Sequence, residues 1–111
     1  MHKLEIKLLR MSMRPKIKRH ICTESFAKCS LFKPNGIPAS ELVKVSIEID
    51  EFETIRLVDI EGLSQQDAAK KMQVSRQTFA NILKKARFKI TNALREGHAL
   101  VLPDKLTIYE E

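Results

Sequence analysis

The chain has 111 residues, of which 43% are hydrophobic and 31% are charged, with a formal net charge of +6. These values are typical of one soluble globular domain and exclude a disordered tail. The longest apolar run has four residues (99–102), which is too short to span a membrane. Two cysteines, three glycines and no tryptophan leave little basis for a disulfide framework, a phosphate-binding loop or an aromatic ligand cage. We expect a cytoplasmic protein that is not an enzyme and needs no cofactor.

The positive charge is concentrated in two segments. Residues 1–20 have a net charge of +6 and residues 76–97 have a net charge of +5, whereas the rest of the chain has a net charge of −5. A basic surplus confined to two segments of an otherwise acidic chain is typical of a surface that binds a polyanion. A membrane surface is disfavoured because the basic segment RPKIKRH has no apolar face opposite its cations.

The first half of the chain predicts short strands and irregular segments. Residues 3–8 alternate between polar and apolar side chains, as a half-buried strand does, and residues 1–20 together form a basic arm or extension. Residues 29–38 predict a loop, because Pro34, Gly36 and Pro38 lie within five residues. Residues 42–49 alternate again and predict a strand with Val43, Val45, Ile47 and Ile49 on one face.

The second half predicts three helices. Asp50 and Glu53 have the spacing of a capping box, so a central buried helix is expected from Asp50 to Gly62. Ser64 and Asp67 mark the start of a short second helix. Ser75 caps a long third helix that runs from residue 76 to about residue 96 and ends at Gly97. Residues 99–102 and 106–109 suggest a short hairpin.

The sequence predicts a helix-turn-helix at residues 64–87. One helix starts at Ser64 and the next at Ser75, and Gln73 lies in the turn between them. The apolar stripe of the third helix begins at Phe79, and side chains such as Gln77 and Asn81 lie opposite to it. The candidate base contacts are Arg76, Gln77, Ala80 and Asn81, because Arg pairs with guanine and Gln or Asn with adenine. The candidate phosphate contacts are Ser64, Ser75, Thr78, Lys84, Lys85, Arg87 and Lys89 in the motif and Arg14, Lys16, Lys18 and Arg19 in the arm. A helical hairpin inside an unrelated bundle is the alternative.

The order of short motifs resembles one prokaryotic family. The segments FKPNGIP, IDEFETIRLVDIEGLSQQDAAKKMQVSRQTF and ARFKITNALREGHAL are similar to the family catalogued as domain of unknown function 134. The resemblance covers about residues 13–102, and it implies a helix-turn-helix similar to region four of sigma factors and DNA binding through residues 64–87. Gln73 stands where the family usually has Gly, and Asn81 stands where an Arg is common.

Weaker signals concern the cysteines and one aromatic residue. His20, Cys22 and Cys29 supply three ligand types for a metal ion, but a fourth is missing, so free thiols that line the core are the favoured interpretation. A redox-switched disulfide between the two cysteines is less expected in a reducing compartment. Phe88 falls on the outer stripe of the third helix, where it is either covered by another segment or used as a subunit contact.

The sequence therefore predicts a mainly α fold with a helix-turn-helix, winged-helix-like or similar to sigma region four, a basic N-terminal arm and one or more short β-strands. The expected segments are 1–20 for the arm, 21–49 for a loop and strand, 50–102 for the helix-turn-helix domain and 103–111 for a tail or short strand. The expected function is sequence-specific binding of double-stranded DNA by a homodimeric transcription regulator, with the alternating strands as pairing surfaces. A protein-interaction adaptor of the transcription machinery and an RNA-binding protein are the alternatives.

Overall fold

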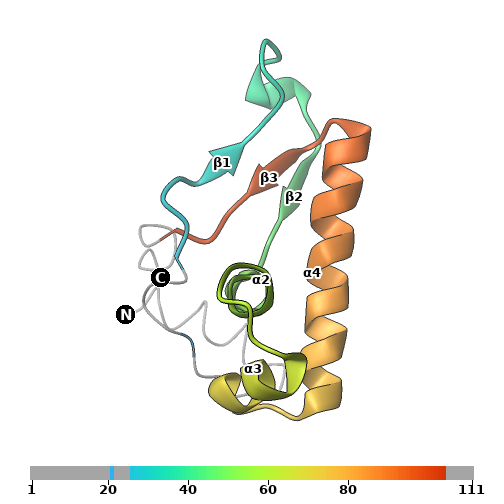
Figure 1. Cartoon of the computed structure of the whole chain (residues 1–111). Coiled ribbons are helices and arrows are strands. Elements are labelled where there is room, and N and C mark those ends of the chain that lie inside the picture. Colours follow the sequence, from blue (N-terminus) through green and yellow to red (C-terminus); the bar gives the residue numbers. More distant parts are fainter. Residues whose placement is uncertain (1–20, 22–25, 105–111) are drawn as a thin grey trace, which may run out of the picture.

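The computed structural model describes residue 21 and residues 26–104, in which helices pack beside a small sheet (Figure 1). The elements in chain order are β1 (Leu31–Phe32), the 3-10 turn η2 (Ala39–Glu41), β2 (Lys44–Ser46), α2 (Ile49–Ile55), η3 (Arg56–Ile60), α3 (Gln65–Met72), α4 (Arg76–Glu96) and β3 (Ala99–Val101). The prediction of a mainly helical protein with short strands is confirmed. None of the helices among these residues has the length and apolar character needed to cross a bilayer.

The sheet has the strand order β1–β3–β2, so the last strand in the chain lies in the middle. β3 pairs antiparallel with β1, with Phe32 opposite Leu100, and parallel with β2, with Val45 opposite Leu100. Gly97, with a φ of 74°, ends α4, and only His98 separates it from β3. The sheet is therefore attached directly to the C-terminal end of the longest helix (Figure 1).

Two expectations about the strands were wrong. Leu31 and Phe32 lie in the segment predicted as loop, but they form β1 because β3, far along the chain, supplies their hydrogen-bonding partners. The predicted strand 42–49 is reduced to β2, and Ile49 belongs to the next helix. The strand predicted at residues 3–8 and the second half of the hairpin at 106–109 lie outside the described residues.

The capping box of α2 lies two residues earlier than predicted. Glu48 is the N-cap residue, and Glu51 returns the second bond of the box by accepting from the Glu48 backbone N–H at 2.9 Å. Asp50 and Glu53 have the same spacing, but both belong to the helix, and Glu53 is buried. The local pattern therefore permitted two starts, and burial of Ile47 immediately before Glu48 is consistent with the earlier one.

α2 occupies the centre of the molecule, where it packs across α4, and it continues as a single π-helical turn, η3. The Glu61 backbone N–H donates to the carbonyl of Arg56, five residues earlier, at 2.8 Å. Leu57 is buried, as expected for a central helix, but Ile60 is 75% exposed. A wider turn changes the helical phase, so the burial predicted for this central helix does not extend to Ile60 at its end.

The core between α3 and α4 is contributed by these two helices and η3. Its fully buried members are Leu57, Ala68, Ala69, Met72, Phe79 and Leu83. The small side chains of Ala68 and Ala69 permit a close approach of α3 to α4, and Val74 packs against this cluster from the connecting turn. The inward stripe of α4 is thus where the sequence predicted it, and the opposite face of its first turns is left at the surface.

Candidate nucleic-acid interface

The turn between α3 and α4 is made by a residue in the left-handed conformation. Gln73 has a φ of 59° and a ψ of 44°, and its backbone N–H donates to the carbonyl of Lys70 at 3.1 Å. The next N–H, that of Val74, donates to the carbonyl of Ala69 at 3.1 Å. Glycine adopts this left-handed backbone conformation more easily than a residue with a side chain, so we expect a small conformational penalty at Gln73.

Both helices of the motif begin at the predicted serines. The Ser64 hydroxyl accepts from the Asp67 backbone N–H at 3.0 Å, and the Ser75 hydroxyl accepts from the Thr78 backbone N–H at 3.0 Å. The Ser75 hydroxyl also donates to the Thr78 hydroxyl at 2.9 Å. These serines therefore fix the two helix starts, and the N-terminal end of α4 is left at the surface with Ser75 and Arg76 both exposed.

The first turns of α4 present two amide side chains side by side. Gln77 and Asn81 are both exposed, and the Gln77 Nε2 donates to the Asn81 Oδ1 at 3.1 Å. Arg76 and Lys84 are exposed on the same stretch of the helix, whereas Ala80 is half-buried. Each amide keeps hydrogen-bonding groups for a base edge, because the bond between them uses one donor and one acceptor.

Three cations of α4, Lys85, Arg87 and Lys89, lie near acids of α2 and η3. Arg87 forms a two-bond pair with Asp59, with 2.7 Å between Nη2 and Oδ1 and 3.3 Å between Nε and Oδ2. Lys89 donates to the buried Glu51 at 2.8 Å and to the Ser46 carbonyl at 2.9 Å. Lys85 Nζ lies 4.0 Å from the second oxygen of Glu51.

The part of α4 that can offer positive charge to DNA is therefore smaller than the net charge of residues 76–97 suggests. Arg87 and Lys89 have carboxylate partners within the fold, whereas Arg76, Gln77 and Asn81, near the start of α4, combine exposure with base-reading chemistry. The burial of Glu51 and Glu53 was not predicted, since no local pattern marks an acidic residue as buried beside a cation of another element. Glu53, for example, accepts two bonds from Arg56, at 2.9 and 3.1 Å.

The remaining predicted site residues are only partly described. Arg14, Lys16, Lys18, Arg19, His20 and Cys22 lie outside the described residues. Cys29 is exposed, so the expectation that it lines the core was wrong. Among residue 21 and residues 26–104, no group of three or more His, Cys, Asp or Glu residues is placed to hold a metal ion.

Comparison with known proteins identifies the family of the chain. The chain is 54% identical over 92 residues to a UPF0251 protein of Vibrio parahaemolyticus, covering 83% of this chain and 94% of that relative. It is 57% identical over 77 residues to a UPF0251 protein of Shewanella sediminis, covering 69% and 80% of the two chains. A UPF0251 protein of Aeromonas salmonicida is 55% identical over 89 residues, covering 80% and 85%. No solved structure matches the chain significantly. The model of the family described as protein of unknown function DUF134 matches residues 8–105, and the chain belongs to this family.

Proposed function

We propose that this protein binds double-stranded DNA in a sequence-specific manner and acts as a transcription regulator. The first turns of α4 enter the major groove, and α3 lies across them and holds them in place. The observation that carries the proposal is the exposed pair of hydrogen-bonded amides, Gln77 and Asn81, on a helix whose opposite face, at Phe79 and Leu83, is fully buried.

This arrangement suits base recognition for three physical reasons. A helix fits the width of the major groove, and residues near its N-terminal end reach base edges most directly. Amide side chains pair with adenine through two hydrogen bonds, and Arg76 at the start of the helix supplies the group that pairs with guanine. Burial of Phe79 and Leu83 fixes the orientation of α4, so the exposed side chains need little ordering when DNA binds.

The distribution of positive charge along the chain also supports DNA as the partner. Residues 1–20 and 76–97 together have a net charge of +11. Positive charge in the arm gives affinity for phosphates without reading sequence, and the first turns of α4 supply the reading. The adaptor alternative would not need amide side chains on the exposed face of α4, and RNA recognition would favour more stacking side chains than a chain with 5% aromatic residues offers.

The test is selection of bound sequences from a random duplex pool, followed by titration of the selected and a scrambled duplex. A preferred sequence should emerge and should bind more tightly than its scrambled form. If about six phosphates are contacted, affinity should fall by about a thousandfold between about 50 and 200 mM salt. No enrichment together with a flat salt response would contradict DNA binding and would favour the adaptor alternative.

A further inference from the structure

Gln77 and Asn81 lie about one turn apart on α4, and a hydrogen bond joins their side chains. The Gln77 Nε2 donates to the Asn81 Oδ1 at 3.1 Å, and both residues are exposed. The nearest other polar side chain on this stretch is that of Thr78, whose hydroxyl accepts from the Ser75 hydroxyl at 2.9 Å. The two amides are therefore paired with each other, whereas Thr78 is bonded within the cap of the helix.

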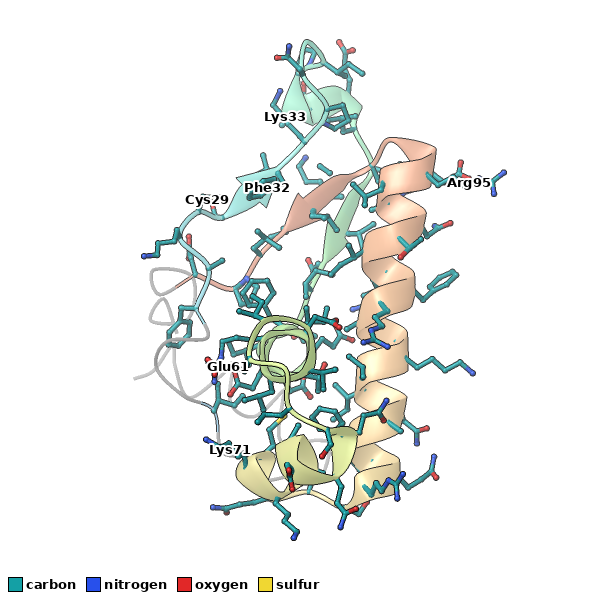
Figure 2. All side chains as sticks on the ribbon, in the orientation of Figure 1. Cys29, Phe32, Lys33, Glu61, Lys71 and Arg95 are labelled. Atoms are coloured by element: carbon teal, nitrogen blue, oxygen red, sulfur yellow. The ribbon has the colours of Figure 1, made fainter. Side chains whose placement is uncertain are left out.

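The bonded pair lies at the end of α4 that is remote from the sheet. α4 begins next to the last turn of α3, which includes Lys71, and its own last turn, which includes Arg95, lies at the opposite end of the molecule (Figure 2). Side chains on a helix lean toward its N-terminal end, so the Asn81 side chain leans toward the turn that has Gln77. Gln77 has the longer side chain and is nearer the N-terminal end, so it is the better placed of the two to reach a base edge.

The bond to Asn81 leaves the Gln77 amide with the two groups that adenine requires. An amide has two N–H donors and an oxygen with two lone pairs, and the bond uses one of the donors of Gln77. Adenine presents an N7 acceptor and an N6 donor in the major groove. The second Nε2 hydrogen and the Oε1 of Gln77 complement these groups. Gln77 can therefore pair with adenine through two bonds while its bond to Asn81 is kept.

We propose that Gln77 reads adenine and that Asn81 is a positioning residue, which holds the Gln77 amide in its reading orientation. This assignment rests on the proposed function, because it requires a DNA duplex. A free glutamine side chain has several rotamers, and ordering it on binding reduces the affinity. A side chain that Asn81 already holds needs less ordering. Exclusion of water from the groove should also strengthen the bond between the two amides.

The backbone under the pair is fixed by burial on the opposite face of α4. Phe79 and Leu83 are buried there, so the first turns of the helix cannot rotate to adjust the two amides. Ala80 is half-buried and has no polar side-chain group that could bond to either amide. The orientation of the Gln77 amide is therefore set by its own side-chain torsions and by the bond that Asn81 accepts.

Titration of the selected duplex, and of variants in which each base pair is changed in turn, tests the two roles. The unchanged protein should prefer adenine at one position by about 5- to 150-fold. Gln77→Ala should abolish this preference, and Asn81→Ala should reduce it at the same position. The double variant should lose no more preference than Gln77→Ala alone, because the effect of Asn81 passes through Gln77.

Asn81→Asp is the conservative variant, because a carboxylate oxygen still accepts from the Gln77 Nε2. It should retain the adenine preference that Asn81→Ala reduces. It should also weaken binding to every duplex alike, because the added negative charge is repelled by phosphates. Asn35→Ala, in the exposed turn after β1, is the control and should change neither the preference nor the affinity. Circular dichroism of each variant establishes that the fold is retained.

Loss of preference at a second base pair in Asn81→Ala, with additive losses in the double variant, would overturn the proposal, because Asn81 would then contact a base of its own. A new preference for cytosine in Asn81→Asp would overturn it equally, since a carboxylate accepts from the N4 of cytosine. Both outcomes leave DNA binding intact. If the unchanged protein enriches no sequence from random duplexes, the proposed function itself is refuted, and the roles of Gln77 and Asn81 with it.

Discussion

Lys89 of α4 donates a hydrogen bond at 2.8 Å to the carboxylate of Glu51, a buried residue of α2. The same carboxylate oxygen accepts the Glu48 backbone N–H at 2.9 Å and so completes the capping box of α2. One carboxylate therefore ties the start of one helix to the middle of another. Because Lys89 also donates to the Ser46 carbonyl at 2.9 Å, it joins α4 to the end of β2 as well.

Replacement of Lys89 by Met should destabilise the fold without changing the preferred DNA sequence. The Glu51 side chain is 4% exposed, so loss of Lys89 leaves a buried carboxylate whose remaining cation, Lys85, lies 4.0 Å away. Breaking such a pair costs about 3 kcal/mol. Urea unfolding measures the change, and Lys84→Met is the matched control because Lys84 is exposed. Equal stability of the two variants would mean that the Lys89–Glu51 pair contributes nothing to the fold.

Gln73→Gly should stabilise the protein by about 0.5–1 kcal/mol, because glycine adopts the left-handed turn without the Cβ penalty. Gln66→Gly is the control. Gln66 is exposed in the first turn of α3, where glycine is a poorer helix former than glutamine and should cost up to about 1 kcal/mol. Thermal melts of both variants should therefore shift in opposite directions. Shifts of the same sign would show that the φ of 59° at Gln73 is not a source of strain.

Phe79→Ala should unfold the domain or loosen it severely. Phe79 is fully buried between α3 and α4, and truncation of a buried Phe costs about 3–5 kcal/mol. Phe88→Ala, on the exposed face of the same helix, is the matched control. At low protein concentration it should leave the melting temperature nearly unchanged. A normal melt for Phe79→Ala would place the helical phase of α4 in doubt.

Gln77→Ala and Asn81→Ala should reduce sequence preference, whereas Lys84→Ala should weaken binding to every duplex similarly. Base-edge contacts discriminate by about 1–3 kcal/mol, and phosphate contacts do not read sequence. Competition between the selected and scrambled duplexes measures both effects. Asn35→Ala, in the exposed turn after β1, is the control for loss of an amide. If Asn81→Ala lowers the affinity for the selected and the scrambled duplex equally, Asn81 does not contact the bases.

Deletion of residues 1–19 should weaken DNA binding and reduce its salt dependence, and the preferred sequence should not change. This segment has seven Lys and Arg residues and one acid, so its expected contribution is counterion release. Titration at several salt concentrations measures the slope, and a melt and a sizing experiment on the same sample test the fold. A lower melting temperature or a changed oligomeric state would assign these residues to the scaffold instead.

The sequence was most informative where structure depends on neighbouring residues. Ser64, Ser75 and Gly97 mark helix ends through local hydrogen bonds and backbone freedom, and all three were located correctly. The sequence was least informative where a partner is distant. Leu31 pairs with Val101, seventy residues later, and Glu51 pairs with Lys89, thirty-eight residues later. No local pattern indicates such pairs.

For the candidate site, exposure of Gln77 and Asn81 followed from the helical period alone, since both lie opposite Phe79. Their hydrogen bond to each other also follows from a spacing of four residues. The pairing of Arg87 with Asp59 could not be predicted, because it depends on how α4 lies against η3.

The central position of β3 determines when the sheet can form during synthesis. β1 and β2 contact each other only through β3, and Lys44 pairs with Ala99, fifty-five residues later. The α3–α4 unit, with Leu57 of η3, is held by contacts that are closer in sequence than those of the sheet, so it can form before the sheet does. The sheet must wait until residue 101 has left the ribosome. Until then the edges of β1 and β2 remain open to other chains, and these two strands are short, which limits the risk of aggregation.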